Sequence, residues 1–248
     1  MSNNSRHAWI IGASQGMGLE LARLLSRDGW QVTISARNPD SLATAALASG
    51  ATPLAFDATE RLAVREASEK VFAARPPQLV VMNVGDYRPM PLEEFDADLF
   101  VSLNRTNYLA SVFLLDAVIP RMREAGGGQV LLNASAAAYR GLPNAAPYSA
   151  PKAAVIHMAE TLAPELARVG IRLRVINPGF VRSRLTEQNR FPMPFLMEPA
   201  EAAQRIARGI QGSSFEISFP RRLTWTLKFL RCLPYRLYFS IIDRWVLR

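Results

Sequence analysis

The chain has 248 residues, of which 49% are hydrophobic and 20% are charged, and this composition excludes a disordered, collagen-like or disulfide-stapled protein. A single cysteine, Cys232, and two histidines 150 positions apart leave too few ligands for a zinc site, so we expect no metal. The net charge is +8, and residues 220–248 carry +6 of it, from seven basic residues and Asp243, so the basicity belongs to that segment.

The first residues lack the pattern of a signal peptide, and no stretch reaches about 18 uncharged apolar residues. A single cysteine is also typical of a protein in a reducing compartment. We therefore expect a cytoplasmic protein, either free in solution or held peripherally at a membrane surface.

Short apolar runs rich in β-branched residues alternate with longer segments of helical periodicity, which predicts strands alternating with helices. Because the runs are almost wholly apolar, we expect strands buried on both faces of a parallel sheet. The predicted fold class is α/β, with one Rossmann-type doubly wound sheet over residues 1–219 and a basic, amphipathic helical extension over residues 220–248. The seven predicted strands are His7–Ile11, Gln31–Ser35, Thr52–Phe56, Leu79–Met82, Gln129–Asn133, Ile171–Ile176 and Phe215–Phe219.

The first predicted strand leads into a glycine-rich segment, Gly12-Ala13-Ser14-Gln15-Gly16-Met17-Gly18, and a helical pattern follows it. Glycine lets a pyrophosphate approach the main chain, and the N-terminus of a helix attracts an anion. The spacing G-x-x-x-G-x-G differs from the common dinucleotide fingerprint, G-x-G-x-x-G. The segment predicts a dinucleotide-binding turn, and a tight turn without a ligand is the alternative.

The end of the second predicted strand indicates which dinucleotide fits. An NAD site places a carboxylate there for the ribose 2′-hydroxyl, whereas an arginine accommodates the 2′-phosphate of NADP. This strand ends in Ser35-Ala36-Arg37-Asn38, so Arg37 favours NADP(H) over NAD, unless it is only a solvated surface residue. Asp57, after the third strand, is a candidate partner for the adenine amino group or an ordinary helix cap.

Tyr148 and Lys152 are four residues apart at the start of a long helical pattern, so their side chains share one helix face. A free tyrosine has a pKa of about 10, and exchange of its proton near neutrality needs that pKa lowered by about three units. A neighbouring ammonium group lowers it, and the positive charge of a nicotinamide adds to the effect. We expect Pro151 in the first helical turn, where backbone N–H groups have no intrahelical acceptor.

Further candidates follow predicted strands. Ser135 comes after the fifth strand, and Asn83-Val84-Gly85 comes after the fourth. The carboxyl ends of parallel strands meet at one edge of the sheet, which is where open sheets of this class bind ligands. Asn107 lies farther along, in a helix predicted to begin near Phe95.

Together these segments resemble the classical short-chain dehydrogenase/reductase family over residues 7–219. The resemblance implies that Tyr148 is the general acid/base and that Ser135 holds the substrate oxygen. It also implies that Lys152 binds the nicotinamide ribose and acidifies Tyr148, and that Asn107, which fits the family pattern better than Asn104, holds a water in a proton relay. The matching residues are Gly12, Gly16, Gly18, Asp57, Asn83-Val84-Gly85, Asn107, Ser135, Tyr148, Lys152 and Asn177-Pro178-Gly179.

The resemblance also implies a cofactor site and an assembly. Members of the family commonly form dimers or tetramers, so we expect a homodimer or homotetramer. The chain departs from the family pattern at Ile11, where threonine or serine is usual, and at Met82, where asparagine is usual. The residues assigned to NADP(H) are Gly12, Ser14, Gln15, Gly16, Met17, Gly18, Arg37, Asp57, Asn83, Gly85, Tyr148, Lys152, Pro178 and Gly179.

The family places a substrate loop after Asn177-Pro178-Gly179. Here the loop contains Phe191-Pro192-Met193-Pro194-Phe195-Leu196-Met197, seven residues without a charge. An uncharged loop suits an apolar or lipid-like substrate, because a charged substrate requires a paired group. A loop that only packs on its own core is the alternative. The residues assigned to the substrate are Phe191, Met193, Phe195 and Leu196.

The segment from residue 221 onward predicts two amphipathic helices separated by Pro234. Basic residues surround their apolar faces, as in a helix pair that lies in the plane of an anionic lipid surface. Packing on the same or a second subunit is the alternative, and nucleic acid is not expected because no reading element accompanies the charge. The apolar faces consist of Leu223, Leu227 and Leu230 in the first helix and Tyr238, Ile241, Ile242 and Trp245 in the second.

We therefore predict an oxidoreductase that transfers a hydride between NADP(H) and a lipophilic carbonyl compound or secondary alcohol, with Tyr148 moving the proton. The alternative is a protein that binds NADP(H) at a membrane surface without turnover. The joint presence of Ser135, Tyr148, Lys152 and Asn107 favours the enzyme. A sugar-nucleotide epimerase of the extended branch of the superfamily is disfavoured, because it needs a larger C-terminal substrate domain.

Overall fold

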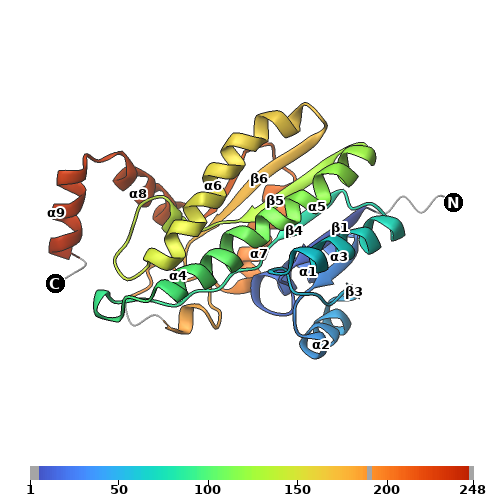
Figure 1. Ribbon diagram of the computed structural model, residues 1–248, viewed down its shortest axis with the longest axis horizontal. Helices are drawn as coiled ribbons and strands as arrows, with labels where there is room; N and C mark the ends of the chain where they lie inside the picture. Colours follow the sequence, from blue (N-terminus) through green and yellow to red (C-terminus); the bar gives the residue numbers. More distant parts are fainter. Residues whose placement is uncertain (1–5, 189–191, 246–248) are drawn as a thin grey trace.

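A computed structural model describes residues 6–188 and 192–245 and contains one seven-stranded sheet (Figure 1). The strand order is β3-β2-β1-β4-β5-β6-β7, and every neighbouring pair is parallel. The predicted doubly wound α/β fold is confirmed, and each predicted strand overlaps an observed one. The strands are β1 (His7–Ile11), β2 (Gln31–Ser35), β3 (Thr52–Pro53), β4 (Leu79–Met82), β5 (Gly128–Asn133), β6 (Ile171–Pro178) and β7 (Glu216–Phe219).

The edge strand β3 is shorter than predicted, because only Thr52 and Pro53 belong to the ladder with β2. Proline has no N–H group to give to a ladder, and it is tolerated at the edge of a sheet. The chain nevertheless stays beside β2, since the N–H groups of Leu54 and Phe56 donate hydrogen bonds of 2.9 and 3.2 Å to the carbonyls of Ile34 and Ala36.

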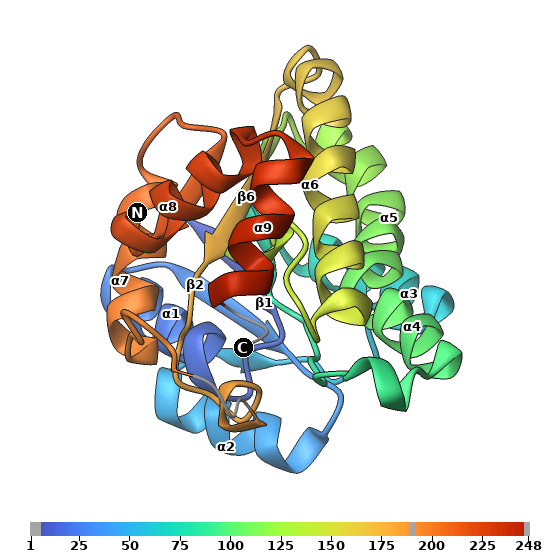
Figure 2. The ribbon, with the colours of Figure 1, turned by 90° about the vertical axis from the view of Figure 1, so that its left-hand side faces the viewer.

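Helices cover both faces of the sheet (Figure 2). One layer contains α1 (Gly16–Arg27), α2 (Pro39–Ser49) and α7 (Pro199–Ile210). The other contains α3 (Arg61–Ala74), α4 (Ala97–Asn104), α5 (Ala110–Glu124) and α6 (Ala146–Ala167). Short helical turns are η1 (Leu92–Glu94), η2 (Arg105–Leu109), η3 (Ala136–Ala138) and η4 (Thr186–Gln188).

The strand β1 shows how one sheet supplies two cores. Its side chains alternate, so Trp9 and Ile11 join the core under α3, α5 and α6, whereas Ala8 and Ile10 join the core under α1, α2 and α7. All five of its residues are buried. Burying a large apolar side chain contributes roughly 1.5–3 kcal/mol, which explains why the strand is apolar on both faces.

The order of the strands reverses between β1 and β4, which are neighbours at the centre of the sheet. In this topology the crossover helices leave from opposite faces at that point and open a crevice at the carboxyl ends of the strands. β1 ends just before Gly12, β4 just before Asn83, and β5 just before Ala134 and Ser135. The fold therefore brings the predicted site segments to one edge.

After β7 the chain forms α8 (Arg221–Cys232) and α9 (Tyr235–Trp245), which stand at the carboxyl end of the sheet (Figure 1). The inner side of α8 packs on β7 and η3, and its Lys228 forms an ion pair with Glu216 of β7. Packing on the same subunit, one of the two predicted alternatives, thus holds for one face of this segment. The division of the chain at residues 219 and 220 stays a prediction.

Two further properties concern residues 6–188 and 192–245. Within them, no helix combines the length and the apolar character needed to cross a membrane. In the same residues, no group of three or more histidine, cysteine, aspartate or glutamate side chains is arranged to hold a metal ion.

Candidate active site

A cavity of about 760 Å³ lies at the carboxyl edge of the sheet, where β1, β4 and β5 end. Nearly all of the residues predicted to bind the cofactor line it, together with Ser135. Gly18 and Asn107 do not line the cavity, although both are described and lie directly behind its wall. The predicted residues that line it are Gly12, Ser14, Gln15, Gly16, Met17, Arg37, Asp57, Asn83, Gly85, Ser135, Tyr148, Lys152, Pro178 and Gly179.

Two positions of the glycine-rich turn require glycine because neighbouring atoms lie too close for a Cβ. Gly12 has a φ of +86°, and a Cβ there would lie 2.8 Å from the backbone nitrogen of Val84. A Cβ on Gly18 would lie 2.7 Å from Nδ2 of Asn83, so Gly18 is needed for packing, and its contact with the cofactor stays a prediction. Gly16 has a φ of +59° and open space around it, so its backbone faces the cavity.

The first turn of α1 is free to hold an anion. Its N-cap residue, Gln15, makes no capping hydrogen bond through its side chain to any described residue. The first N–H groups of a helix have no intrahelical acceptor, and they lie at the positive end of the helix dipole. A phosphate group would satisfy these donors from the cavity.

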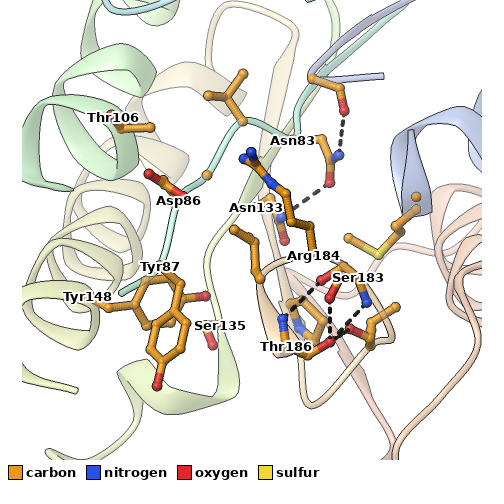
Figure 3. A pocket seen from close by; sticks show the side chains of 18 of the residues that line it. Asn83, Asp86, Tyr87, Thr106, Asn133, Ser135, Tyr148, Ser183, Arg184 and Thr186 are labelled. Atoms are coloured by element: carbon orange, nitrogen blue, oxygen red, sulfur yellow. Dashed lines mark hydrogen bonds between the residues drawn. The ribbon is translucent and has the colours of Figure 1, made fainter. Parts of the chain in front are cut away.

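The catalytic candidates come from β5 and α6. Figure 3 shows Tyr148 and Ser135 on the same side of the cavity. Lys152 is 1% exposed, and its Nζ lies 5.9 Å from the centroid of the Tyr148 ring. α6 begins at Ala146, so Pro151 is its sixth residue. The prediction that Pro151 lies in the first turn is wrong, because the helix begins earlier, and its first turn contains Pro147.

Hydrogen bonds connect the lysine to the glycine-rich turn. Lys152 Nζ donates to the backbone carbonyl of Asn133 at 2.7 Å, and Nδ2 of Asn133 donates to Oδ1 of Asn83 at 3.2 Å. Nδ2 of Asn83 then donates to the carbonyl of Gly12 at 2.8 Å. Figure 3 shows the bonds made by Asn83. This series holds the ends of β1, β4 and β5 in one arrangement with α6.

Asn107 lies in the π-helical turn η2 and is almost fully buried. Its amide accepts a hydrogen bond from the N–H of Asp86 at 3.1 Å and donates one of 2.9 Å to the carbonyl of Asp86. A Cβ on Gly85 would lie 3.1 Å from Oδ1 of Asn107 and 3.3 Å from Nζ of Lys152, so glycine at this position lets the two side chains approach. The helix before η2 begins at Ala97, with Asp96 as its N-cap, two residues after the predicted start.

Comparisons with known proteins agree with this geometry. A model of the short chain dehydrogenase family matches residues 6–192. The chain belongs to the short-chain dehydrogenase family. It is 35% identical over 239 residues to an uncharacterized oxidoreductase of Myxococcus xanthus, a match that covers 94% of each chain. It is 32% identical over 193 residues to a gluconate 5-dehydrogenase of Gluconobacter oxydans, with 75% of each chain covered.

Solved structures show the same fold. A short chain dehydrogenase from Burkholderia cenocepacia in complex with NADP has a TM-score of 0.85 and 23% identity, and 98% of this chain and 99% of that chain are covered. An actinorhodin polyketide ketoreductase with NADPH has a TM-score of 0.81 and 24% identity, with 90% and 98% covered. The chain is thus an oxidoreductase of a family whose members bind nicotinamide cofactors.

In this family member, Arg37 stands at the rim of the cavity with 77% of its side chain exposed. Its nearest acidic partner is Asp57, at 3.8 Å, a contact too long and too exposed to hold it firmly. Oδ1 of Asp57 accepts hydrogen bonds of 2.8 Å from both the N–H and the hydroxyl of Thr59. Asp57 therefore stabilises the turn before α3, while its Oδ2 is directed to Arg37. It is not the cap of that helix, because the N-cap of α3 is Glu60.

Burial dominates the protonation of the two catalytic candidates. It raises the pKa of Tyr148, and a hydrogen bond with Ser135 opposes this effect only in part. Burial lowers the pKa of Lys152 to about 7. In the chain alone the effect of burial on the pKa of Tyr148 prevails, and Lys152 Nζ is bonded to Asn133. The acidification of Tyr148 by Lys152 beside a bound nicotinamide stays a prediction.

The part of the predicted substrate loop that the structure describes, residues 192–197, does not line the cavity. Met193, Phe195 and Leu196 are outside its lining, and Phe191 lies outside the described residues. The lining after Gly179 comes instead from residues 180–186, next to the start of the predicted loop. The role of the four residues in substrate binding stays a prediction.

Sequence reasoning missed several lining residues. The ring of Tyr87 lies edge-on to that of Tyr148, with centroids 5.1 Å apart. Leu223 and Leu227 of α8 close one side of the cavity, although their segment had been predicted as an appendage. Arg184 points into the cavity opposite Tyr148 in Figure 3. The sequence offered one signal for the two leucines: Leu223, Leu227 and Leu230 are four and three residues apart and so share one helix face. This pattern does not show which part of the protein that face covers.

Proposed function

We propose that the chain is an NADP(H)-dependent oxidoreductase that interconverts a lipophilic carbonyl compound and the corresponding secondary alcohol. The observation that carries this proposal is the common cavity of Tyr148, Ser135, Lys152 and the glycine-rich turn. A binding protein would need the turn but not a buried tyrosine beside a serine hydroxyl and a lysine.

The residues present fit NADP(H). Gly16 has open space on the cavity side, and the first turn of α1 has free N–H donors for a pyrophosphate. Arg37 extends from the end of β2, where the chain has no carboxylate before Asp40 and the Asp57 carboxylate, 3.8 Å away, faces the guanidinium. Two structural neighbours, one in complex with NADP and one with NADPH, support the choice of NADP(H) over NAD.

When bound, the dinucleotide supplies the hydride. Tyr148 then donates the matching proton to the substrate oxygen, and Ser135 donates a hydrogen bond to the same atom as negative charge develops on it. The raised pKa of Tyr148 keeps its phenol protonated at neutral pH, which is the state that reduction requires at the start. Lys152, held by Asn133, stands beside the phenol and is placed to bind the ribose.

An apolar substrate follows from the side chains around Tyr148. Tyr87 lies edge-on to Tyr148, and Leu142, Leu223 and Leu227 line the same cavity. α8 contacts η3, which begins directly after Ser135. Such a lining favours a substrate with an apolar body and one polar oxygen. A charged group placed against these four side chains would lose hydration without gaining a partner from them, whereas Arg184 lies across the cavity.

The test is oxidation of NADPH, followed at 340 nm on the order of minutes, with a panel of hydrophobic aldehydes and ketones. We expect turnover with some members and a loss of roughly 10²–10⁴-fold in kcat for Tyr148→Phe, with NADPH affinity unchanged. Tyr108→Phe, outside the cavity on η2, is the matched control and should behave as wild type. NADPH binding without turnover on any substrate would favour the alternative of a non-enzymatic binder, and equal rates for Tyr148→Phe would disprove the mechanism.

A further inference from the structure

The outer side of α8 and α9, which we call the tail surface, exposes large apolar side chains to solvent. Each of them is between 56% and 68% exposed, a high value for side chains of this size. Trp225 and Phe229 are four residues apart and therefore share one face of α8. The apolar members of the tail surface are Trp225, Phe229, Tyr235, Leu237 and Phe239.

These residues point outward because other positions of the same helices face the protein. Thr224, Tyr238 and Ile242 are buried, and Leu223 and Leu227 line the cavity. Most of the apolar faces noted in the sequence thus face the protein, and the side chain of Trp245 lies outside the described residues. The tail surface is a second apolar set. On α8 it lies opposite the cavity, and on α9 its members flank the buried positions Tyr238 and Ile242.

The corner between α8 and α9 is fixed to the core by Arg140. Its guanidinium donates hydrogen bonds to the carbonyls of Arg231 and Leu233 and lies 4.5 and 4.4 Å from the ring centroids of Tyr235 and Tyr238. The hydroxyl of Tyr238 also donates to the carbonyl of Gly141. The tail surface is therefore a structured face of the molecule.

The tail surface is also strongly basic. Five exposed arginines lie on or beside it, and none of the ion pairs among the described residues involves them. The one acidic residue of this segment is Asp243. Arginines around exposed aromatic rings are typical of a helix pair at a lipid headgroup layer, where the rings enter the interface and the guanidinium groups meet phosphates. The five arginines are Arg221, Arg222, Arg231, Arg236 and Arg244.

Charge also argues against a second copy of the chain as the occupant. A two-fold contact through the tail surface would place the same arginines against one another. Like charges at short range repel, and no described carboxylate on this surface other than Asp243 could compensate them.

We propose that the tail surface binds the surface of an anionic lipid bilayer, with α8 and α9 lying in the interfacial plane. α8 then has lipid on its outer side and the cavity on its inner side, through Leu223 and Leu227. The cavity lies one helix away from the bilayer. A lipophilic substrate could pass from lipid to cavity with little exposure to water, and this last step alone rests on the proposed function.

Sedimentation with vesicles of phosphatidylcholine, with and without phosphatidylglycerol, tests the proposal with the full chain. We expect binding to the anionic vesicles and not to the neutral ones, and weaker binding as salt is added. Arg236→Glu/Arg244→Glu should weaken it roughly tenfold or more, since each basic residue near such a surface contributes about 1 kcal/mol. Trp225→Ser/Phe229→Ser should weaken it similarly. The matched control, Arg123→Glu/Arg168→Glu, makes the same charge change on exposed arginines of α5 and the end of α6.

A second measurement distinguishes lipid contact from a folding defect. In a Trp245→Phe background, which leaves Trp225 as the tryptophan of α8 and α9, lipids brominated near the headgroup should quench its fluorescence. Adding Trp225→Phe should remove that quenching while the protein still sediments with the vesicles. Each variant should retain the wild-type Tm and NADPH affinity, because its residues are outside the cavity.

Several outcomes would overturn the proposal: no sedimentation with either vesicle, equal sedimentation with both, or wild-type binding by the charge-reversed variant. A dimer that dissociates in the same variants, without lipid binding, would assign the tail surface to a second copy. Sedimentation does not require turnover, so failure here leaves the proposed function intact, and a failed activity screen leaves this proposal intact.

Discussion

Nζ of Lys152 donates a 2.7 Å hydrogen bond to the carbonyl oxygen of Asn133, the last residue of β5. The lysine is thereby tied to the sheet, while its own helix carries Tyr148 one turn earlier. Asn133 in turn holds Asn83 through its amide, and Asn83 holds Gly12. The cofactor turn and the catalytic helix are thus positioned by the same two asparagines.

Asn83 lies between Asn133 and Gly12 in this series of hydrogen bonds, so removing its side chain should make the glycine-rich turn less rigid. Asn83→Ala loses the hydrogen bonds to Gly12 and Asn133, each contributing about 1 kcal/mol, and should raise the KM for NADPH by roughly tenfold with a smaller effect on kcat. Asn83→Asp should be worse, because an ionised carboxylate would face the carbonyl of Gly12. Steady-state kinetics and Tm measure both effects, and equal KM values for the three proteins would contradict the role of Asn83.

The buried Lys152 predicts how stability depends on pH. Its pKa falls from an ordinary value of 10.5 to about 7 on folding. Between these values the unfolded chain binds the proton and the folded chain does not, so the free energy of unfolding should rise with pH by at most about 1.4 kcal/mol per unit. Below pH 7 the full cost of burying the charge is present.

Urea denaturation of the cofactor-free protein between pH 7 and 9 measures this slope. Lys152→Met removes the titrating group, so the increase in the free energy of unfolding that Lys152 causes should be absent. The variant should exceed wild type in stability most near pH 7. A slope that is the same in wild type and variant would show that Lys152 stays charged in the folded chain.

The choice between the two dinucleotides is assigned to Arg37. Arg37→Asp should weaken NADPH by roughly 10–100-fold and NADH far less, because a hydrogen bond between charged groups contributes about 1.5–3 kcal/mol and the new carboxylate repels the 2′-phosphate. Titration of protein fluorescence with each dinucleotide measures the affinities. Arg27→Asp, an exposed arginine at the end of α1, is the matched control. Equal losses for both dinucleotides would place the 2′-phosphate elsewhere.

Part of this molecule could be predicted from its sequence because the deciding forces are local. β1, β2 and β4 have the bounds that their apolar runs predicted, and the segments after β1, β4 and β5 had to meet at one edge once the sheet was parallel. Gly12 and Gly18 could be recognised because the turn itself demands them.

The rest depends on contacts between distant segments. The role of Asn133 comes from its position between Lys152 and Asn83, which only the register of β4 and β5 determines. Leu227 reaches the cavity because α8 turns back over η3, and an amphipathic pattern does not say which surface its apolar face will meet. The upward shift of the Tyr148 pKa reflects removal of the phenol from water, which the spacing to Lys152 could not reveal.

The expected homo-oligomer has a candidate surface on α6. An apolar groove of about 410 Å³ runs along it and includes Ala154, Met158 and Leu162, with Tyr108 from η2. We expect light scattering to give a mass above that of one chain, and Met158→Glu to shift it toward the monomer, because an unpaired carboxylate would be buried in the contact. Leu62→Glu, at an exposed apolar position on α3, is the control. A monomeric wild-type protein would end this prediction.

Leu223 and Leu227 of α8 line the cavity, so a substitution there tests whether α8 contacts the substrate. Leu227→Ala removes apolar surface on the cavity side, so kcat/KM for the best apolar substrate should fall roughly 10-fold or more, while the KM for NADPH stays unchanged. Leu237→Ala makes the same change on the exposed side of α9 and should leave both constants unchanged. A fall in NADPH affinity for Leu227→Ala would mean that α8 supports the cofactor half of the cavity. A normal kcat/KM for every substrate would mean that the substrate does not reach α8, and the apolar substrate class would then lose its main support.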